Sequence, residues 1–151
     1  MPFRNKASRP WWATTARLGV GAWFVANLYE GVVDVPRLLA DAAGNRRPGL
    51  MSAGSPVRFF VPLGAVTLGS AAVTVAHSWK SRDDRRRTAA AAASVGAATA
   101  ITGYLVRTAN VPLLMSADLD TGKRDKLISR WHRGNALRLV LLGIGGVLLD
   151  R

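Results

Sequence analysis

Two stretches of the chain carry polar side chains at the spacing of a single helix face. The first contains Asn27, Glu30 and Asp34, and the second contains Trp131, Asn135 and Arg138. A carboxylate on such a face can accept a proton, while guanidinium and amide groups can stabilise negative charge. These residue types indicate acid–base chemistry if the fold brings the two faces together.

The elements that must position these residues are four apolar blocks, at about residues 12–33, 57–79, 88–107 and 130–149. Each is close to the ~20 residues that an α-helix needs to cross the hydrocarbon core of a bilayer. The core of the fourth block, residues 136–149, is short and contains Arg138, and it reaches a spanning length only when extended back through His132 and Trp131. Ionisable residues in a membrane helix are often functional. We predict an all-α fold: an integral membrane four-helix bundle in one domain, with antiparallel neighbours.

Two features outside the polar faces refine this prediction. The longest connection, residues 34–55, has room for a short surface helix at about residues 37–43. The third block is rich in small residues at spacings of four, which let helix backbones approach closely; these are Ala89, Ala93 and Ala97. Gly143, Gly145 and Gly146 are expected to do the same in the fourth block, and Pro112 is expected to end the third.

The charge of the chain indicates a membrane rather than a nucleic acid. Its 151 residues carry a formal net charge of +12, but the Lys and Arg residues lie between the apolar blocks, where they would meet anionic lipid headgroups. The densest basic loop, at residues 80–87, would share a side with both termini. The positive-inside rule therefore predicts a multi-pass protein of the cell membrane with both termini in the cytoplasm.

Several chemistries are excluded or disfavoured. The chain has no Cys, which rules out disulfides, thiolate nucleophiles and Cys-based metal centres. Its two histidines, His77 and His132, would lie about 30 Å apart across the bilayer, so we predict no metal site, although a site from Glu30, His132 and a neighbour stays open. No cofactor is predicted from the residues.

Antiparallel threading would bring both polar faces to the same end of the bundle, together with Arg58, Arg107 and Asn110. Because an unpaired charge at that depth is unfavourable, we predict that Glu30 pairs with Arg138. The catalytic candidates are Glu30, Arg138 and Asn110, and the substrate-binding candidates are Asn27, Trp131, His132 and Asn135. The structural alternative is that these residues only join the helices or extend towards headgroups.

The order of these features resembles the anthrone-oxygenase-like family of small four-helix membrane proteins. The matching stretches are ANLYEGVVDVP, SPVRFFVPLGAVTLGS, TANVPL and WHRGNALRLVLLGIGG, within residues 19–146. The resemblance implies four membrane helices and oxidation of an anthrone-type polyketide by molecular oxygen to the quinone. The family-like positions are Glu30, Asn110, Pro112, Trp131, Asn135 and Arg138. On this hypothesis Glu30 removes a proton next to the carbonyl, and Arg138 stabilises the enolate without a metal.

Other functions remain open beside an oxygenase of lipophilic aromatic substrates. One is a non-catalytic membrane subunit or assembly factor that binds partner helices. Another is a small transporter or lipid-binding protein, and a soluble helical bundle is a fourth. The expected partners are membrane lipids, a lipophilic small molecule, and a second copy or another membrane protein; nucleic acid is not expected.

Overall fold

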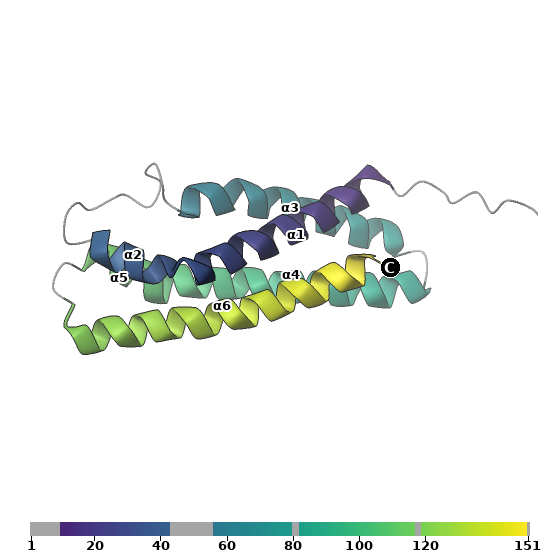
Figure 1. Cartoon of the computed structure of the whole chain (residues 1–151). Helices are drawn as coiled ribbons and strands as arrows, with labels where there is room; N and C mark the ends of the chain where they lie inside the picture. The colour runs from purple at the N-terminus through teal and green to yellow at the C-terminus, as the bar shows by residue number, and fades with distance from the viewer. Residues whose placement is uncertain (1–9, 43–55, 80–81, 117–118, 151) are drawn as a thin grey trace, which may run out of the picture.

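Four long helices make up most of this computed structural model, which describes residues 10–42, 56–79, 82–116 and 119–150. They are α1 (Trp11–Val32), α3 (Pro56–Ser78), α4 (Arg82–Leu105) and α6 (Thr121–Asp150). Successive long helices run in opposite directions (Figure 1). Helices α1 and α4 each pack against both α3 and α6. The described part of the chain is therefore all-helical, and α1 and α6 are antiparallel neighbours.

Contacts at one end of the helices confirm this threading. The ring of Trp12 near the start of α1 lies against the ring of His77 near the end of α3, with centroids 4.6 Å apart. Arg17 of α1 forms an ion pair with Asp150 at the end of α6. The beginning of α1 and the ends of α3 and α6 are thus together, as the predicted threading requires.

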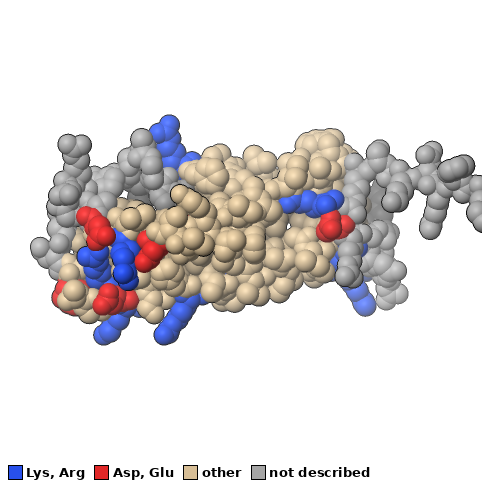
Figure 2. Space-filling view, viewed as in Figure 1, with Lys and Arg blue, Asp and Glu red and all other residues tan. Residues whose placement is uncertain are grey.

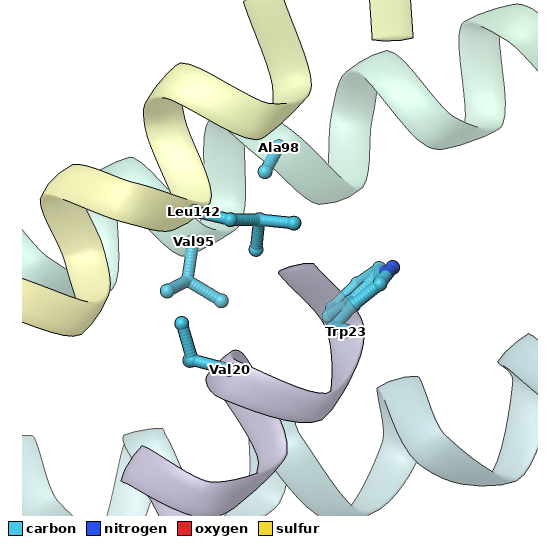
Figure 3. Close-up of a cluster of buried hydrophobic side chains, with 5 residues drawn as sticks. All are labelled: Val20, Trp23, Val95, Ala98 and Leu142. Atoms are coloured by element: carbon cyan, nitrogen blue, oxygen red, sulfur yellow. The ribbon is translucent and has the colours of Figure 1, made fainter. Parts of the chain in front are cut away.

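The apolar core lies where α1, α4 and α6 meet. Figure 3 shows its buried side chains, Val20, Trp23, Val95, Ala98 and Leu142. Of the glycines predicted to allow close packing, Gly145 lies directly against α4, since a Cβ there would come 2.9 Å from Val95 Cγ2. Burial of these side chains joins three of the four long helices.

The face of α4 that packs inwards is not the predicted alanine stripe. Ala93 and Ala97 are exposed. The buried positions are Ala91, Ser94, Val95, Ala98 and Leu105. Val95 and Leu105 bury more apolar area than alanine does, which explains why the helix turns that face towards the core.

Two helices begin earlier in the chain than the apolar blocks from which we predicted them. Helix α4 begins at Arg82 rather than near residue 88, and α6 begins at Thr121 rather than near residue 130. Lys and Arg are good helix formers, so a helix can continue beyond its apolar segment. Asp120 caps α6, because its Oδ1 accepts the backbone N–H of Lys123 at 2.8 Å. This bond lowers the pKa of the exposed Asp120 carboxyl.

The prediction that Pro112 ends the third helix is wrong. The chain continues from α4 through a π-helical turn, η1 (Val106–Asn110), into the short helix α5 (Val111–Met115). Proline has no N–H to donate to the carbonyl of Thr108, four residues earlier. Arg130 of α6 donates to that carbonyl instead, at 3.4 Å. The π turn thus accommodates the proline and keeps the chain helical.

The predicted surface helix is present as α2 (Val35–Ala42), and the rest of the predicted 34–55 connection, residues 43–55, lies outside the described residues. Asp34 joins α1 to α2 in a left-handed conformation with φ of 53°, which aspartate tolerates better than most residues. Its carbonyl accepts the backbone N–H groups of Arg37 and Leu38. Arg124 of α6 forms an ion pair with Asp41, which fastens α2 to α6.

The surface between the two ends is largely apolar. Charged side chains gather towards the ends of the molecule and leave an uncharged region between them (Figure 2). Within the described residues, two segments are long and apolar enough to cross a membrane, Arg58–Ser78 and Arg85–Met115. The predicted spans at residues 12–33 and 130–149 do not meet the same criterion of length and composition.

The contact between α1 and α3 depends on the absence of a side chain at Gly19. A Cβ there would come 3.1 Å from Thr67 Cβ and 3.3 Å from Thr67 Cα, and Thr67 is held by its own bond to the carbonyl of Leu63. We expect Gly19→Ala to lower the unfolding free energy by about 1–3 kcal/mol through overpacking. Thermal unfolding in detergent measures this effect. The control is Gly21→Ala, where a Cβ meets no atom of the described residues within 4 Å. Equal stability of the two variants would contradict this prediction.

Candidate functional site

A buried ion pair between Glu30 and Arg138 lies at the centre of the candidate site. Arg138 Nη2 is 3.3 Å from Glu30 Oε2, and the two side chains are only 4% and 10% exposed for Arg138 and Glu30, respectively. The antiparallel packing of α1 and α6 places these two residues at the same depth. The pair predicted from the sequence is therefore present.

Three further side chains position the guanidinium of Arg138. Its Nη2 donates to Asn135 Oδ1 at 2.8 Å, one turn earlier on α6. Its Nη1 donates to Thr102 Oγ1 of α4 at 3.3 Å. The ring of Trp131 lies beneath it, with the guanidinium carbon 6.0 Å from the centroid. Thr102 was missed by the sequence analysis because a threonine in an Ala-rich helix carries no special signal.

Two of the three predicted asparagines, Asn27 and Asn135, lie behind this pair and join α1 to α6. Asn135 Nδ2 donates to the carbonyl of Asn27 at 3.0 Å, and Asn27 Nδ2 donates to the carbonyl of Trp23 at 2.8 Å. Gly31 leaves room for the Asn135 amide, since a Cβ there would be 3.0 Å from Asn135 Nδ2. Neither asparagine lines the cavity described next, so their contacts support Arg138 and the helix contact.

The ion pair forms part of the wall of a cavity of about 310 Å³. Its polar lining includes four of the predicted site residues, Glu30, Asn110, Trp131 and Arg138. Most of the remaining wall is apolar and comes from α1, α3 and α4; it includes Trp23, Phe60, Val61, Leu68 and Leu105. A mostly apolar cavity of this size with a few convergent polar groups is typical of sites for small molecules.

Three polar atoms of the cavity residues have no hydrogen-bond partner among the residues that the structure describes. They are Trp23 Nε1, Asn110 Oδ1 and Arg138 Nε, and all three atoms are buried. Asn110 is in the π turn η1, a type of irregularity that is frequent at functional sites. Because buried polar groups are usually satisfied, these two donors and one acceptor mark the cavity-lining residues as candidates for binding a polar ligand atom.

The cavity opens sideways between α3 and α4. Three of its lining residues are exposed, Val61 and Ala65 on α3 and Gly103 on α4. Both helices belong to the two segments that are apolar and long enough to cross a membrane, of which the second continues from α4 through η1 and α5. An apolar molecule could therefore enter from the side without passing the charged ends.

His132, predicted to bind substrate, lies outside the cavity wall. Its Nε2 is 3.0 Å from Asp34 Oδ1, and the other carboxylate oxygen of Asp34 is 3.1 Å from Arg37 Nε. His132 directly follows Trp131, and consecutive residues of a helix differ by about 100° in direction. That rotation turns His132 towards α2 while Trp131 faces the cavity.

Trp23 is a cavity residue that the sequence analysis missed, although a signal was present. It lies four residues before Asn27 and so shares a face of α1 with it.

In the described parts of the chain, no cluster of three His, Asp or Glu residues could hold a metal ion. Comparison of the chain with protein-family models, curated proteins and solved structures found no match.

Proposed function

We propose that this chain is an integral membrane four-helix bundle of the cell membrane, with both termini in the cytoplasm. Support comes from large apolar side chains that are exposed on all four long helices, among them Leu18, Val66, Tyr104 and Val140. Only 11% of the apolar stretch of α3 is buried inside the protein, whereas a core helix of a water-soluble protein would be mostly buried. Lipid would cover this surface at little cost in free energy.

Within that bundle, we propose an oxygenase that acts on a lipophilic aromatic compound of the anthrone class. The observation that carries the proposal is the side-opening cavity with the buried Glu30–Arg138 pair in its wall. Its apolar part suits fused aromatic rings, and Arg138 can hold a ketone oxygen as that oxygen becomes negative. The stretches that resemble the anthrone-oxygenase-like family support the same reaction class.

The proposed reaction needs no resident cofactor. Glu30 takes a proton from the CH₂ group of the anthrone, and the resulting anion gives its electrons to molecular oxygen to form a C–O bond. The peroxide takes the proton back from Glu30. Loss of the second C–H proton, with cleavage of the O–O bond, then releases water and leaves the quinone. One anthrone and one O₂ thus give one quinone and one H₂O, with Glu30 regenerated.

Substrate binding must loosen the ion pair in this mechanism. Glu30 Oε2 accepts a hydrogen bond from Arg138, and that oxygen must be released from the bond before it can take a proton from the substrate. Asn135 and Thr102 continue to bind the guanidinium if Glu30 turns away. Arg138 could then transfer its interaction from the carboxylate to the ketone oxygen of the substrate.

The test is oxidation of anthrone in air by the purified protein in detergent. We expect quinone to form faster than in buffer and detergent alone, with one O₂ consumed for each quinone. Glu30→Gln is expected to lower the rate at least 100-fold, because general-base catalysis typically contributes 10²–10⁴-fold. A rate equal to the spontaneous reaction would contradict the proposal.

A second candidate function is a non-catalytic membrane subunit or assembly protein. The supporting observation is an exposed apolar face of α6, formed by Leu137, Val140, Ile144 and Val147, beside which Gly143 and Gly146 leave an open groove with α1. Such surfaces let a partner helix approach closely. Stoichiometric recovery of another membrane protein, together with no anthrone oxidation, would favour this function.

A further inference from the structure

Trp23 occupies two environments at once. Its side chain is 2% exposed and belongs to the core cluster with Val20, Val95 and Leu142. In Figure 3 its indole nitrogen lies on the edge of the ring that is turned away from Val20 and Val95. The same residue lines the cavity, with its ring 3.7 Å from the position of a Cβ at Gly64. The same ring therefore belongs to the core cluster and forms part of the cavity wall.

Within the described part of the chain, the indole N–H of Trp23 has no acceptor. A buried Trp usually finds a partner for this donor, because an unsatisfied buried donor is unfavourable. Phenylalanine or leucine would fill an apolar core position without that cost. A tryptophan at this place is thus explained if a molecule in the cavity supplies the acceptor.

We infer that Trp23 is a specificity-determining residue that donates its N–H to an oxygen atom of the bound aromatic molecule. This inference rests on the proposed function, since it concerns the same cavity. The acceptor is a carbonyl or phenolate oxygen, which an aromatic hydrocarbon of the same shape lacks. Trp23 then selects oxygen-bearing ring systems over plain hydrocarbons that partition equally well into the bilayer.

The test is a cycle of two ligands and two proteins, measured without oxygen so that no turnover occurs. Anthrone and anthracene share a three-ring framework, but only anthrone has a ketone. The dissociation constants of both compounds are measured for the wild-type protein and for Trp23→Phe. We expect Trp23→Phe to weaken anthrone binding about five- to tenfold more than anthracene binding, the loss typical of one hydrogen bond.

Two controls separate the hydrogen bond from packing. Trp12→Phe makes the same exchange at the opposite end of the helices, outside the cavity, and should change neither affinity. If Trp23→Phe folds poorly, β-(3-benzothienyl)alanine at position 23 keeps the bicyclic shape and removes only the N–H. The same selective loss of anthrone affinity is expected for that variant.

Each outcome decides the inference. Equal weakening of both ligands would show that Trp23 acts through packing alone and would overturn it, as would the absence of anthrone binding by the wild-type protein. If anthrone binds selectively through Trp23 but is not oxidised in air, the inference stands and the proposed oxygenase activity fails. If anthrone is oxidised but Trp23→Phe loses no selectivity, the activity stands and the inference fails.

Discussion

Arg138→Gln is expected to lower the unfolding free energy of the protein by about 3–5 kcal/mol, the usual cost of breaking a buried ion pair by removing one partner. The substitution leaves the Glu30 carboxylate buried without its cation. It also removes the guanidinium N–H groups that donate hydrogen bonds to Asn135 Oδ1 and Thr102 Oγ1. Unfolding in mixed micelles with increasing SDS measures the loss. The matched control is Arg37→Gln in the exposed Asp34–Arg37 pair, where less than about 1 kcal/mol is expected.

A double-mutant cycle shows whether the loss comes from the pair itself. Glu30→Gln alone should cost less than Arg138→Gln, because Arg138 keeps its bonds to Asn135 and Thr102. In the double variant both charges are absent, so its loss should be smaller than the sum of the two single losses by at least 1 kcal/mol, within the range measured for coupled residues. Additive losses would show that Glu30 and Arg138 are not energetically coupled, despite their 3.3 Å separation.

The pairing of these two residues could be predicted because it follows from two local rules. Glu30 and Arg138 each lie on a polar face of an otherwise apolar helix, and a charge in such a position needs a partner. Antiparallel connection of the helices then leaves few partners at the same depth. The same reasoning predicted Asn27 and Asn135 at the same end of the helices, and in the structure the carbonyl of Asn27 accepts the Asn135 amide.

The ends of the helices could not be predicted from apolar length. That length measures how much of a helix suits lipid, whereas α6 extends from its apolar part through Arg124 to a cap at Asp120. Helix propensity and capping decide where a helix begins. The motif Asp-Thr-Gly-Lys at residues 120–123 carried that signal. The π turn before Pro112 had no comparable signal, and the carbonyl of Thr108 accepts a hydrogen bond from Arg130 of another helix, which a local sequence pattern does not reveal.

The cavity itself was beyond sequence reasoning. It depends on where small residues of neighbouring helices line a common space, as Gly64 and Ala65 of α3 and Gly103 of α4 do. The rotation of each helix decides this, and α4 rotated away from the predicted stripe of Ala93 and Ala97. For the same reason, sequence reasoning included His132 among the site residues and missed Trp23, although both lie within one turn of a correctly predicted residue.

Val66→Lys is expected to prevent stable membrane integration, whereas Val32→Lys is expected to be tolerated. Val66 is 55% exposed near the middle of α3, and Val32 is 76% exposed at the end of α1. A lysine at the centre of a membrane helix costs about 2.5–3.5 kcal/mol, but near a helix end its amine reaches the headgroups. The measurement is the fraction of protein that stays in membranes after an alkaline carbonate wash.

Comparing the two lysine variants shows whether lipid or water surrounds the exposed apolar surface. In water, an exposed Val→Lys change is close to neutral at either position, and the added charge would raise solubility. In a bilayer the same change is severe at Val66 and mild at Val32, because only the helix centre is remote from water. Equal behaviour of the two variants, with both proteins in the aqueous fraction, would contradict the membrane assignment and with it the sideways opening as a route for lipophilic substrates.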